Sequence, residues 1–223
     1  RVPVPITTGR GAEHAFIVLE YLELARGLDA RDEWAVALAH MLADLHEVSG
    51  AHYGWPYSNF IGMSVQLNTP SDSWVDFWRD YRLIPQLRLA ERIGHDGELI
   101  ALGERVASAL PALFDGHAPA PSLLHGDLWN GNAAFTAGGE PVIYDPAVYY
   151  GDREADIAMT ELFGGFPREF HDTYFDLAPV NEGYALRRDV YNLYHVLNHL
   201  NLFGGVYREK AQALMQRALA EIS

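Results

Sequence analysis

Apolar residues recur with a helical period along most of the chain. They fall on every third or fourth position from residue 32 to 48 and again from residue 71 to 93, where Pro85 lies inside the pattern. A period of 3.6 residues predicts an amphipathic helix, and a proline within it predicts a kink. Residues 49–70 are polar and marked by glycine and proline, which is typical of a loop. The pattern predicts further helices over residues 98–110, 153–163, 168–177, 185–202 and 206–222.

Short apolar runs bounded by glycine predict a few strands. Phe16 to Leu22 is expected to form a buried strand that pairs with the stretch before the glycine-rich turn at residues 7–11. Residues 133–135 and 142–144 flank the pair Gly138-Gly139 and predict a small β-hairpin. Because helices dominate and strands are few, the pattern indicates an α+β fold.

Composition and charge narrow the functional classes. Of the 223 residues, 49% are hydrophobic, which is enough for a packed core. The formal net charge of −14 disfavours nucleic acid and anionic membrane surfaces as partners, because both require a positive face. The absence of cysteine excludes disulfides, zinc-thiolate sites and a thiol nucleophile. With no transmembrane run and no signal peptide, a soluble cytoplasmic protein is expected, and its oligomeric state stays open.

The densest group of candidate catalytic residues lies between residues 123 and 156. Asp127 ends a His-Gly-Asp tripeptide, and Asn132 stands five residues later. The predicted hairpin then returns the chain to Asp145. Mg²⁺ prefers hard oxygen ligands and binds through one or two carboxylates plus substrate phosphates. Asp145 and the amide oxygen of Asn132 can supply such ligands, and Asp127 then remains free to accept a hydrogen bond from an attacking hydroxyl.

The spacing matches that of a kinase catalytic loop. The pattern H-R-D-x-x-x-x-N has the same interval from Asp to Asn and is followed by a metal-binding Asp. Here Gly126 replaces the arginine, and Asp145-Pro-Ala replaces Asp-Phe-Gly. These departures disfavour a protein kinase regulated through its activation loop and favour the small-molecule branch of the kinase fold. A lone His-Gly-Asp is common, and an Asp near an Asn often only bonds a turn, but the full constellation is specific.

Two further segments gain a role if the fold is kinase-like. The strand at residues 16–22 then runs into a hinge whose backbone holds adenine, with Glu20 offering its carbonyl and Leu22 its amide and carbonyl. Otherwise it is an ordinary strand. On the helix predicted after residue 185, His195 and His199 stand four residues apart, a spacing that fits two metal ligands. No Glu follows His195 and no third ligand is evident in the sequence, so a hydrogen-bonding face is favoured.

With these residues in place, the chain resembles the fructosamine kinases, or ketosamine 3-kinases, of the aminoglycoside-phosphotransferase and choline-kinase superfamily. Trp129 inside the catalytic motif and the string Asp145-Pro-Ala-Val-Tyr-Tyr-Gly separate this family from its relatives. The resemblance implies a protein-kinase-like fold with a mainly helical C-terminal lobe, a small catalytic hairpin and a remnant of the N-terminal-lobe sheet. It spans nearly the whole chain and is carried by residues 16–22, 59–87, 125–132, 145–156, 162–166 and 197–205.

The resemblance also implies a reaction. The γ-phosphate of ATP is transferred to the sugar 3-hydroxyl of a ketosamine, either a small glycated amine or a glycated protein lysine, and the product decays with deglycation. Carried over to this sequence, Asp127 is the base, and Asn132 and Asp145 bind Mg²⁺. An indole offers a flat apolar wall to a sugar, and an imidazole hydrogen-bonds hydroxyls. In keeping with this chemistry, the resemblance implies that Trp129 and His199 border the sugar.

Two residues are expected to support the site. His125 opens the catalytic motif, and Asp156 lies on the first turns of the helix predicted over residues 153–163. In a kinase fold an Asp at this place bonds the backbone of the catalytic loop. The alternative is an exposed acid in the first turn of a helix.

The N-terminal part departs from the family pattern. Such kinases carry a phosphate-covering loop, a strand lysine and a helix glutamate ahead of the strand pair, and this sequence shows none of them. Residues 1–24 are therefore expected to be a remnant of the N-terminal lobe, with its last strands and the hinge, and residues 25–223 the C-terminal catalytic lobe. We expect a truncated kinase. A related kinase for aminoglycosides, choline or homoserine and a non-catalytic binding remnant are the alternatives.

Overall fold

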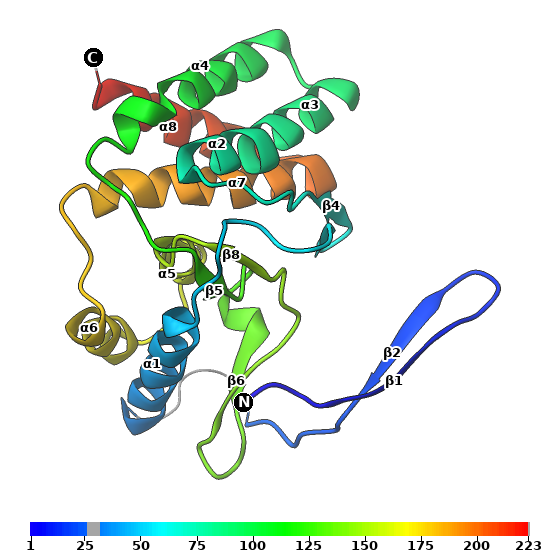
Figure 1. Ribbon diagram of the computed structural model, residues 1–223. Coiled ribbons are helices and arrows are strands. Elements are labelled where there is room, and N and C mark those ends of the chain that lie inside the picture. Colours follow the sequence, from blue (N-terminus) through cyan, green and yellow to red (C-terminus); the bar gives the residue numbers. More distant parts are fainter. Residues whose placement is uncertain (26–31, 223) are drawn as a thin grey trace.

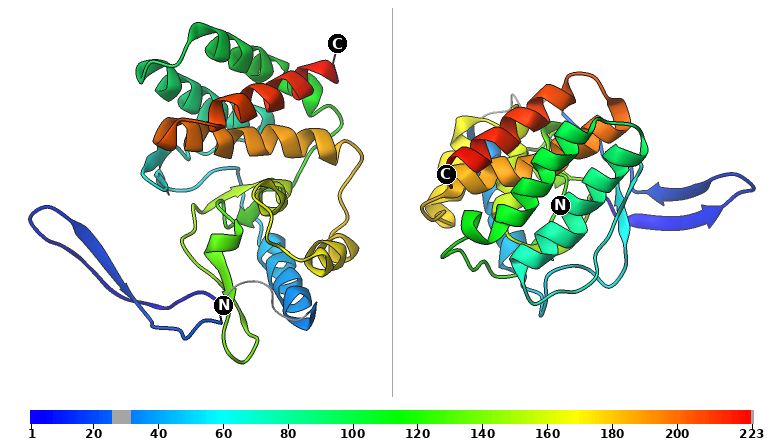
Figure 2. Two further views of the ribbon diagram at one scale, coloured as in Figure 1. Left: turned by 180° about the vertical axis from the view of Figure 1, so that it is seen from behind. Right: turned by 90° about the horizontal axis from the view of Figure 1, so that it is seen from above.

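The computed structural model describes residues 1–25 and 32–222. A β-hairpin near the N-terminus projects from a mainly helical body (Figure 1), and the views from behind and from above agree (Figure 2). The described strands pair as four antiparallel two-stranded sheets, β1–β2, β3–β4, β5–β8 and β6–β7. The strands are β1 (Pro5–Arg10), β2 (Ala15–Leu19), β3 (Asn59–Ile61), β4 (Ser64–Gln66), β5 (Ser122–Leu124), β6 (Ala133–Phe135), β7 (Pro141–Ile143) and β8 (Tyr149–Gly151). The helices are α1 (Asp32–Glu47), α2 (Trp74–Trp78), the π-helix η1 (Arg79–Leu83), α3 (Ile84–Arg92), α4 (Gly97–Leu113), the 3₁₀-helix η2 (Asn130–Asn132), α5 (Glu154–Leu162), α6 (Arg168–Leu177), α7 (Tyr184–Phe203) and α8 (Tyr207–Ala220).

The larger part of the core fills the space between α7 and the helices around it. Helix α7 packs against α8, α5 and α3, and α4 packs against α8 and α3. Trp74 and Trp78 of α2 are buried against Tyr191 of α7, and the Trp74 indole donates a hydrogen bond to the Tyr191 hydroxyl. The apolar face of one predicted helix thus meets the apolar face of another, as the helical period of both segments requires.

A second hydrophobic cluster supports the catalytic hairpin. Helix α1 packs against α6, and Leu38 of α1 and Phe170 and Tyr174 of α6 are buried in one cluster. Leu128, next to Asp127 in the chain, and Phe135 of β6 belong to the same cluster. The loop that carries the candidate chemistry is therefore anchored in a packed core, although its polar side chains face elsewhere.

The helices predicted from periodicity are confirmed, with shifts of one or two residues at most of their ends. The long helix predicted after residue 71 begins at Trp74 and is capped by Ser73, whose side chain accepts a hydrogen bond from the Asp76 amide. Its predicted interruption at Pro85 takes the form of η1, which ends just before that proline. Proline lacks the amide that an α-helix needs, so the hydrogen-bond ladder shifts there. Among the described helices, none combines the length and the apolar character of a membrane span.

Three predictions of local structure are wrong. Strand β2 pairs with β1 as expected, but it is exposed rather than buried, with Phe16 54% exposed, because β1 is the main neighbour that the described residues provide. The supposed loop at residues 49–70 contains the β3–β4 hairpin, whose three-residue strands are too short for an alternating pattern to stand out. Helix α4 continues through Pro111, since the burial of Leu110 and Leu113 holds its last turn in place.

The N-terminal hairpin is joined to the catalytic hairpin by main-chain hydrogen bonds. The Ala25 amide donates to the Phe135 carbonyl at 2.7 Å, and the Ile143 amide donates to the Arg1 carbonyl at 3.0 Å. The predicted boundary between residues 1–24 and 25–223 lies beside residues 26–31, and these, like residue 223, are outside the described part of the chain.

Candidate active site

The His-Gly-Asp turn lies between β5 and η2 and requires glycine at its centre. Gly126 has a φ of 82°, and a Cβ at this position would lie 2.1 Å from the Ala147 carbonyl oxygen. The Ala147 amide in turn donates a hydrogen bond to the His125 carbonyl at 2.8 Å. Only glycine takes up this conformation without steric cost. The close approach of the two loops therefore explains why no arginine stands at position 126.

Asp156 holds this turn through its carboxylate. The amides of His125 and Gly126 donate hydrogen bonds to it at 2.7 and 2.8 Å, and His46 Nε2 lies 3.2 Å from it. Burial alone would raise the pKa of Asp156, but the hydrogen bond and charge of His46, together with the Gly126 amide, outweigh it and keep the pKa below its usual value. The turn is thus fixed by an ionised carboxylate whose hydrogen bonds are satisfied.

His125 braces the same turn from its side chain. Its Nδ1 accepts a hydrogen bond from the Asp127 amide at 3.3 Å, so the proton of the neutral ring is on Nε2 and is donated to the Tyr144 carbonyl at 2.9 Å. Burial lowers the pKa of His125, which favours this neutral form. The imidazole therefore ties the turn to the residue just before Asp145.

Four predicted residues line one cavity of about 480 Å³, here called the site cavity, and they are Asp127, Trp129, Asn132 and Asp145. Asn132 donates from Nδ2 to the Asp127 carbonyl at 2.9 Å and, over a longer distance of 3.4 Å, to the Asp127 carboxylate. Burial raises the pKa of Asp127 to about 7, the charges of Asp156 and Asp145 add to the rise, and the Asn132 hydrogen bond opposes it.

Asn132 and Asp145 present oxygen atoms that fit a hard cation. The Asn132 amide group uses its Nδ2 on Asp127 and on the Asp145 carbonyl, and no described residue donates a hydrogen bond to its Oδ1, which can therefore bind a ligand. Asp145 has a φ of 54° and is the one non-glycine residue with positive φ in the described chain. Such a conformation is costly and clusters at functional sites. A carboxylate and an amide oxygen in one cavity match the ligand preference of Mg²⁺ held together with substrate phosphates.

Trp129 and His199, both predicted to border the sugar, are separated by Phe163. The rings of Trp129 and Phe163 lie 6.3 Å apart, and those of Phe163 and His199 lie 5.1 Å apart. Trp129 lines the site cavity, whereas His199 does not. Trp129 therefore lies against the site cavity, whereas His199 is separated from Trp129 by the ring of Phe163.

Two histidines near the site were assigned no partner from the sequence. His195 is buried, and its Nδ1 lies 3.9 Å from Asp127 Oδ1 without a hydrogen-bond partner among the described residues. Burial lowers the pKa of His195 to about 3, so the ring is neutral. His46 reaches Asp156 from α1, and its Nδ1 lies 2.6 Å from the Tyr174 hydroxyl. The helical period put both histidines on helices, but only tertiary packing reveals their partners.

The predicted hinge residues lie outside the site cavity. The Glu20 amide donates to the Val4 carbonyl at 2.8 Å, and the Glu20 carboxylate pairs with Arg1. The amide and carbonyl of Leu22 have no hydrogen-bond partner in the part of the chain that is described. Leu22 therefore offers main-chain groups to a ligand, whereas the amide of Glu20 is already used.

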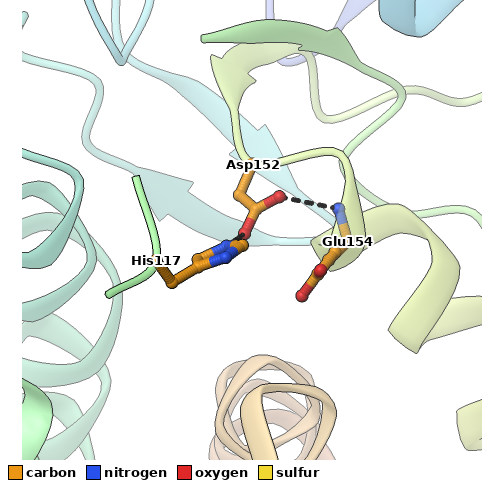
Figure 3. A group of neighbouring side chains, drawn as sticks. All are labelled: His117, Asp152 and Glu154. Atoms are coloured by element: carbon orange, nitrogen blue, oxygen red, sulfur yellow. Dashed lines mark hydrogen bonds and ion pairs between the residues drawn. The ribbon is translucent and has the colours of Figure 1, made fainter. Parts of the chain in front are cut away.

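A separate group of ionisable side chains lies at the start of α5 (Figure 3). His117 Nε2 lies 2.5 Å from Asp152 Oδ2, and the Glu154 amide donates to Asp152 Oδ1 at 3.0 Å. Asp152 also accepts a hydrogen bond from the Tyr191 hydroxyl, and Arg187 donates to both oxygens of Glu154 at 2.7 and 2.8 Å. A metal ion here would have to displace Arg187 from a buried ion pair. We therefore interpret this group as a hydrogen-bonded brace between α5 and α7.

Comparison with known proteins decides the family. The model of the fructosamine kinase family matches residues 1–221. The chain belongs to this family. A Synechocystis protein named as a ketoamine kinase is 47% identical over 220 residues, which cover 98% of this chain and 72% of that protein. A chloroplastic protein-ribulosamine 3-kinase of Oryza sativa subsp. japonica is 40% identical over 218 residues, covering 96% of this chain and 62% of the rice protein.

Solved structures agree with this membership. A structure named as a fructosamine-3-kinase from Haemophilus somnus 129PT matches with a TM-score of 0.87 at 30% identity, covering 98% of this chain and 73% of that one. A choline/ethanolamine kinase family protein from Mesorhizobium loti shares the fold with a TM-score of 0.60 at 14% identity, covering 100% of this chain and 73% of that one. The kinase-like α+β fold and the resemblance to fructosamine kinases are thus confirmed. This family member is a phosphotransferase with an alcohol group as acceptor.

Proposed function

We propose that this fructosamine kinase family member transfers the γ-phosphate of ATP to the sugar 3-hydroxyl of a ketosamine, the adduct of a sugar with an amine or a protein lysine. The observation that supports this most directly is the site cavity itself, in which Asp127, Asn132 and Asp145 lie together beside Trp129. The names of the relatives, ketoamine kinase and protein-ribulosamine 3-kinase, support the same substrate class. The cytoplasm is the proposed place of action, because ATP is available there.

Asp127 is the proposed base. The oxygen of the sugar 3-hydroxyl forms a bond to the γ-phosphorus, the bond from that phosphorus to the ADP oxygen breaks, and Asp127 accepts the hydroxyl proton. A pKa of about 7 keeps a large fraction of Asp127 ionised at neutral pH. A stronger base is not required, because phosphoryl transfer depends mainly on positioning and charge stabilisation.

Asn132 and Asp145 are the proposed ligands of Mg²⁺, which when bound neutralises charge on the phosphates. Their oxygen donors fit this ion, as the free Oδ1 of Asn132 and the strained Asp145 backbone indicate. His125 and Asp156 hold the turn so that Asp127 keeps its place relative to both ligands. Precise placement matters because a misplacement of about 1 Å can cost about 100-fold in rate.

The remaining contacts follow the same proposal. Trp129 gives the sugar a flat apolar wall, and His199 extends that wall beyond Phe163. The carbonyl of Glu20 and the amide and carbonyl of Leu22 hold adenine. On this proposal residues 1–24 contribute the hinge side of the nucleotide site, and residues 25–223 form the catalytic lobe.

The proposed product is unstable by ordinary carbonyl chemistry. Proton loss from C1 converts the C2 carbonyl into an enaminol that spans C1 and C2. The phosphate on C3 then leaves as inorganic phosphate, and hydrolysis releases the amine. The net result of the phosphorylation is deglycation of the amine or protein lysine.

A substrate panel tests this function. ADP release is coupled to a spectrophotometric readout with Mg·ATP, using protein produced from the full reading frame. The acceptors are ribulose-lysine, fructose-lysine, choline, homoserine and kanamycin. We expect turnover with one or both ketosamines and none with the other three. Turnover confined to choline, homoserine or kanamycin would assign the chain to a related kinase, and ATP binding without turnover of any acceptor would make it a binding protein.

A further inference from the structure

A second cavity, of about 540 Å³, adjoins the site cavity across the β3–β4 hairpin. Residues 60–62 of the hairpin line the site cavity, and residues 63–65 line the second one. The hairpin is therefore a wall shared by both. Helix α3 and Asn201 and Leu202 in the last turn of α7 complete the second cavity, and Figure 1 shows β4 beside that end of α7. A substrate whose sugar occupies the site cavity has this second cavity within reach over the turn of the hairpin.

Two residues that line the second cavity each carry a buried oxygen without a hydrogen-bond partner among the described residues. The oxygens are Oγ of Ser64, a residue only 6% exposed, and Oδ1 of Asn201. The Asn201 amide is oriented by its NH₂ group, which donates to the Gln86 carbonyl at 3.0 Å and to Gln86 Oε1 at 2.7 Å. A buried polar atom without a partner is destabilising. Both oxygens can accept a hydrogen bond, so a ligand that carries N–H donors would satisfy them.

Two arginines give the second cavity positive charge. Arg88 and Arg92 line the same cavity four residues apart on α3, and both are exposed. Neither guanidinium lies within ion-pair distance of a carboxylate in the described chain, and the nearby Asp80 is already paired with Arg79 at 2.8 Å. In a protein with 30 acidic and 16 basic residues, two unpaired arginines on one face are a specific feature. Guanidinium groups of this kind recognise carboxylates by charge-assisted hydrogen bonds.

Apolar side chains also line the second cavity. Met63 and Val65 are largely exposed on the hairpin, and both line the second cavity together with Leu202. A short chain of methylene groups can cover such a surface and gain by burying it. The cavity therefore combines an apolar lining, acceptors for an ammonium group and cations for a carboxylate.

From this combination we infer that the second cavity binds the free α-amino-acid end of a lysine whose ε-nitrogen carries the sugar. This inference rests on the proposed function, because it requires the sugar to lie in the site cavity. The lysine methylenes cross the hairpin, the α-carboxylate binds Arg88 and Arg92, and the α-ammonium donates to Ser64 and Asn201. A lysine inside a protein has neither charge, since both groups are in peptide bonds. The enzyme is therefore selective for the free glycated amino acid.

Three ribulose adducts that share the same sugar and the same methylene chain test this selectivity. They are ribulose-lysine, the adduct of cadaverine, which lacks the carboxylate, and the adduct of Nα-acetyl-lysine N-methylamide, which mimics a protein lysine. The KM of each is measured for the wild-type enzyme, for the double variant Arg88→Gln/Arg92→Gln and for Arg105→Gln. Arg105 is an exposed arginine on α4 away from both cavities, so this change removes one positive charge without touching the second cavity.

We expect the wild-type enzyme and Arg105→Gln to show a KM for ribulose-lysine about tenfold below that of the other two adducts, equivalent to about 1.4 kcal/mol. In the double variant that ratio falls to about one, while kcat for ribulose-lysine stays within about twofold. Equal KM values for all three adducts with the wild-type enzyme would overturn the inference and leave the proposed function intact, and so would an unchanged ratio in the double variant. If no adduct is phosphorylated by any enzyme, the proposed function itself fails.

Discussion

Two carboxylates at the His-Gly-Asp turn, Asp156 and Asp127, occupy opposite environments. Asp156 is completely enclosed and accepts hydrogen bonds from two amides and His46, which keep its pKa low despite burial. Asp127 is 19% exposed and faces the site cavity, where Asn132 offers it only a 3.4 Å contact and burial raises its pKa to about 7. Asp156 thus forms its hydrogen bonds within the protein, whereas Asp127 can still accept a hydrogen bond from a substrate.

The two carboxylates therefore have different roles: Asp156 holds the backbone of the turn, and Asp127 is the proposed base. Environments that push two nearby pKa values apart are how acid and base roles are assigned in active sites. A residue that holds the backbone is expected to act mainly on stability, because its interactions are complete in the free protein. A residue that waits for a substrate is expected to act mainly on rate. Substitutions at these two carboxylates and at Gly126 test this division of roles.

The largest effect is expected from Asp127→Asn. The variant keeps the shape of the side chain but cannot accept the hydroxyl proton, so kcat should fall by at least about 10³-fold. The KM for Mg·ATP should change less than threefold, because Asp127 is not a proposed metal ligand. Initial rates of ADP release measure both quantities. A variant that keeps more than a tenth of the wild-type kcat would show that Asp127 is not the base.

Asp156→Asn should mainly lower stability. One carboxylate oxygen becomes an NH₂ group that faces a backbone amide or His46, so a buried, charged acceptor is lost. We expect the free energy of unfolding to fall by about 3 kcal/mol, measured by urea denaturation. Asp44→Asn is the matched control on the exposed face of α1 and should change stability by less than about 0.5 kcal/mol. Equal stability of the two variants would contradict the supporting role.

Gly126→Ala separates the cost of close approach from the cost of positive φ. Gly94 also has a positive φ, 94°, but a Cβ there would meet nothing within 4 Å. Gly94→Ala should therefore cost about 1 kcal/mol. Gly126→Ala should cost at least about 2 kcal/mol more and lower kcat about 100-fold, because its Cβ displaces Ala147 and with it the turn. Similar losses in the two variants would show that the contact with Ala147 is unimportant.

The smallest expected effect is a dependence of stability on pH that belongs to Asp127. Its pKa is raised from 3.8 to about 7 in the folded protein, so folding is favoured by proton binding below pH 4, and this contribution is lost as pH rises through 7. Between pH 5 and pH 8, without Mg²⁺, the wild-type protein should lose about 2–3 kcal/mol relative to Asp127→Asn. Urea midpoints at both pH values measure the difference, in which other titrating groups cancel. Parallel pH profiles would mean that Asp127 has an ordinary pKa.

Much of the fold was accessible from the sequence, because amphipathic periodicity reports directly on burial. Helices α1, α6 and α7 follow their predicted ranges within one residue at each end. Prediction failed where burial does not follow from the local pattern. The apolar strand β2 is exposed, and the β3–β4 hairpin is too short to show a period.

The candidate site was predictable to the extent that it is local in the sequence. The spacing of Asp127, Asn132 and Asp145 around one hairpin was sufficient to expect them in one cavity. His46 and His195 come from helices about 80 and 70 residues away in sequence. The contact of His46 with Asp156 and that of His195 with Asp127 therefore depend on tertiary packing. The second cavity could not be predicted from the sequence either, because a hairpin, α3 and the end of α7 form it together.

The most direct test of the proposed function is the position of the phosphate in the product. Ribulose-lysine is incubated with Mg·ATP and the enzyme, and two-dimensional ³¹P–¹H NMR identifies the carbon that carries the phosphate. Lysine and inorganic phosphate are followed in the same sample. The proposed function predicts phosphate on the oxygen at C3, followed by equal amounts of free lysine and inorganic phosphate, and neither product with Asp127→Asn. Phosphate on another hydroxyl, or a product that stays intact, would contradict it.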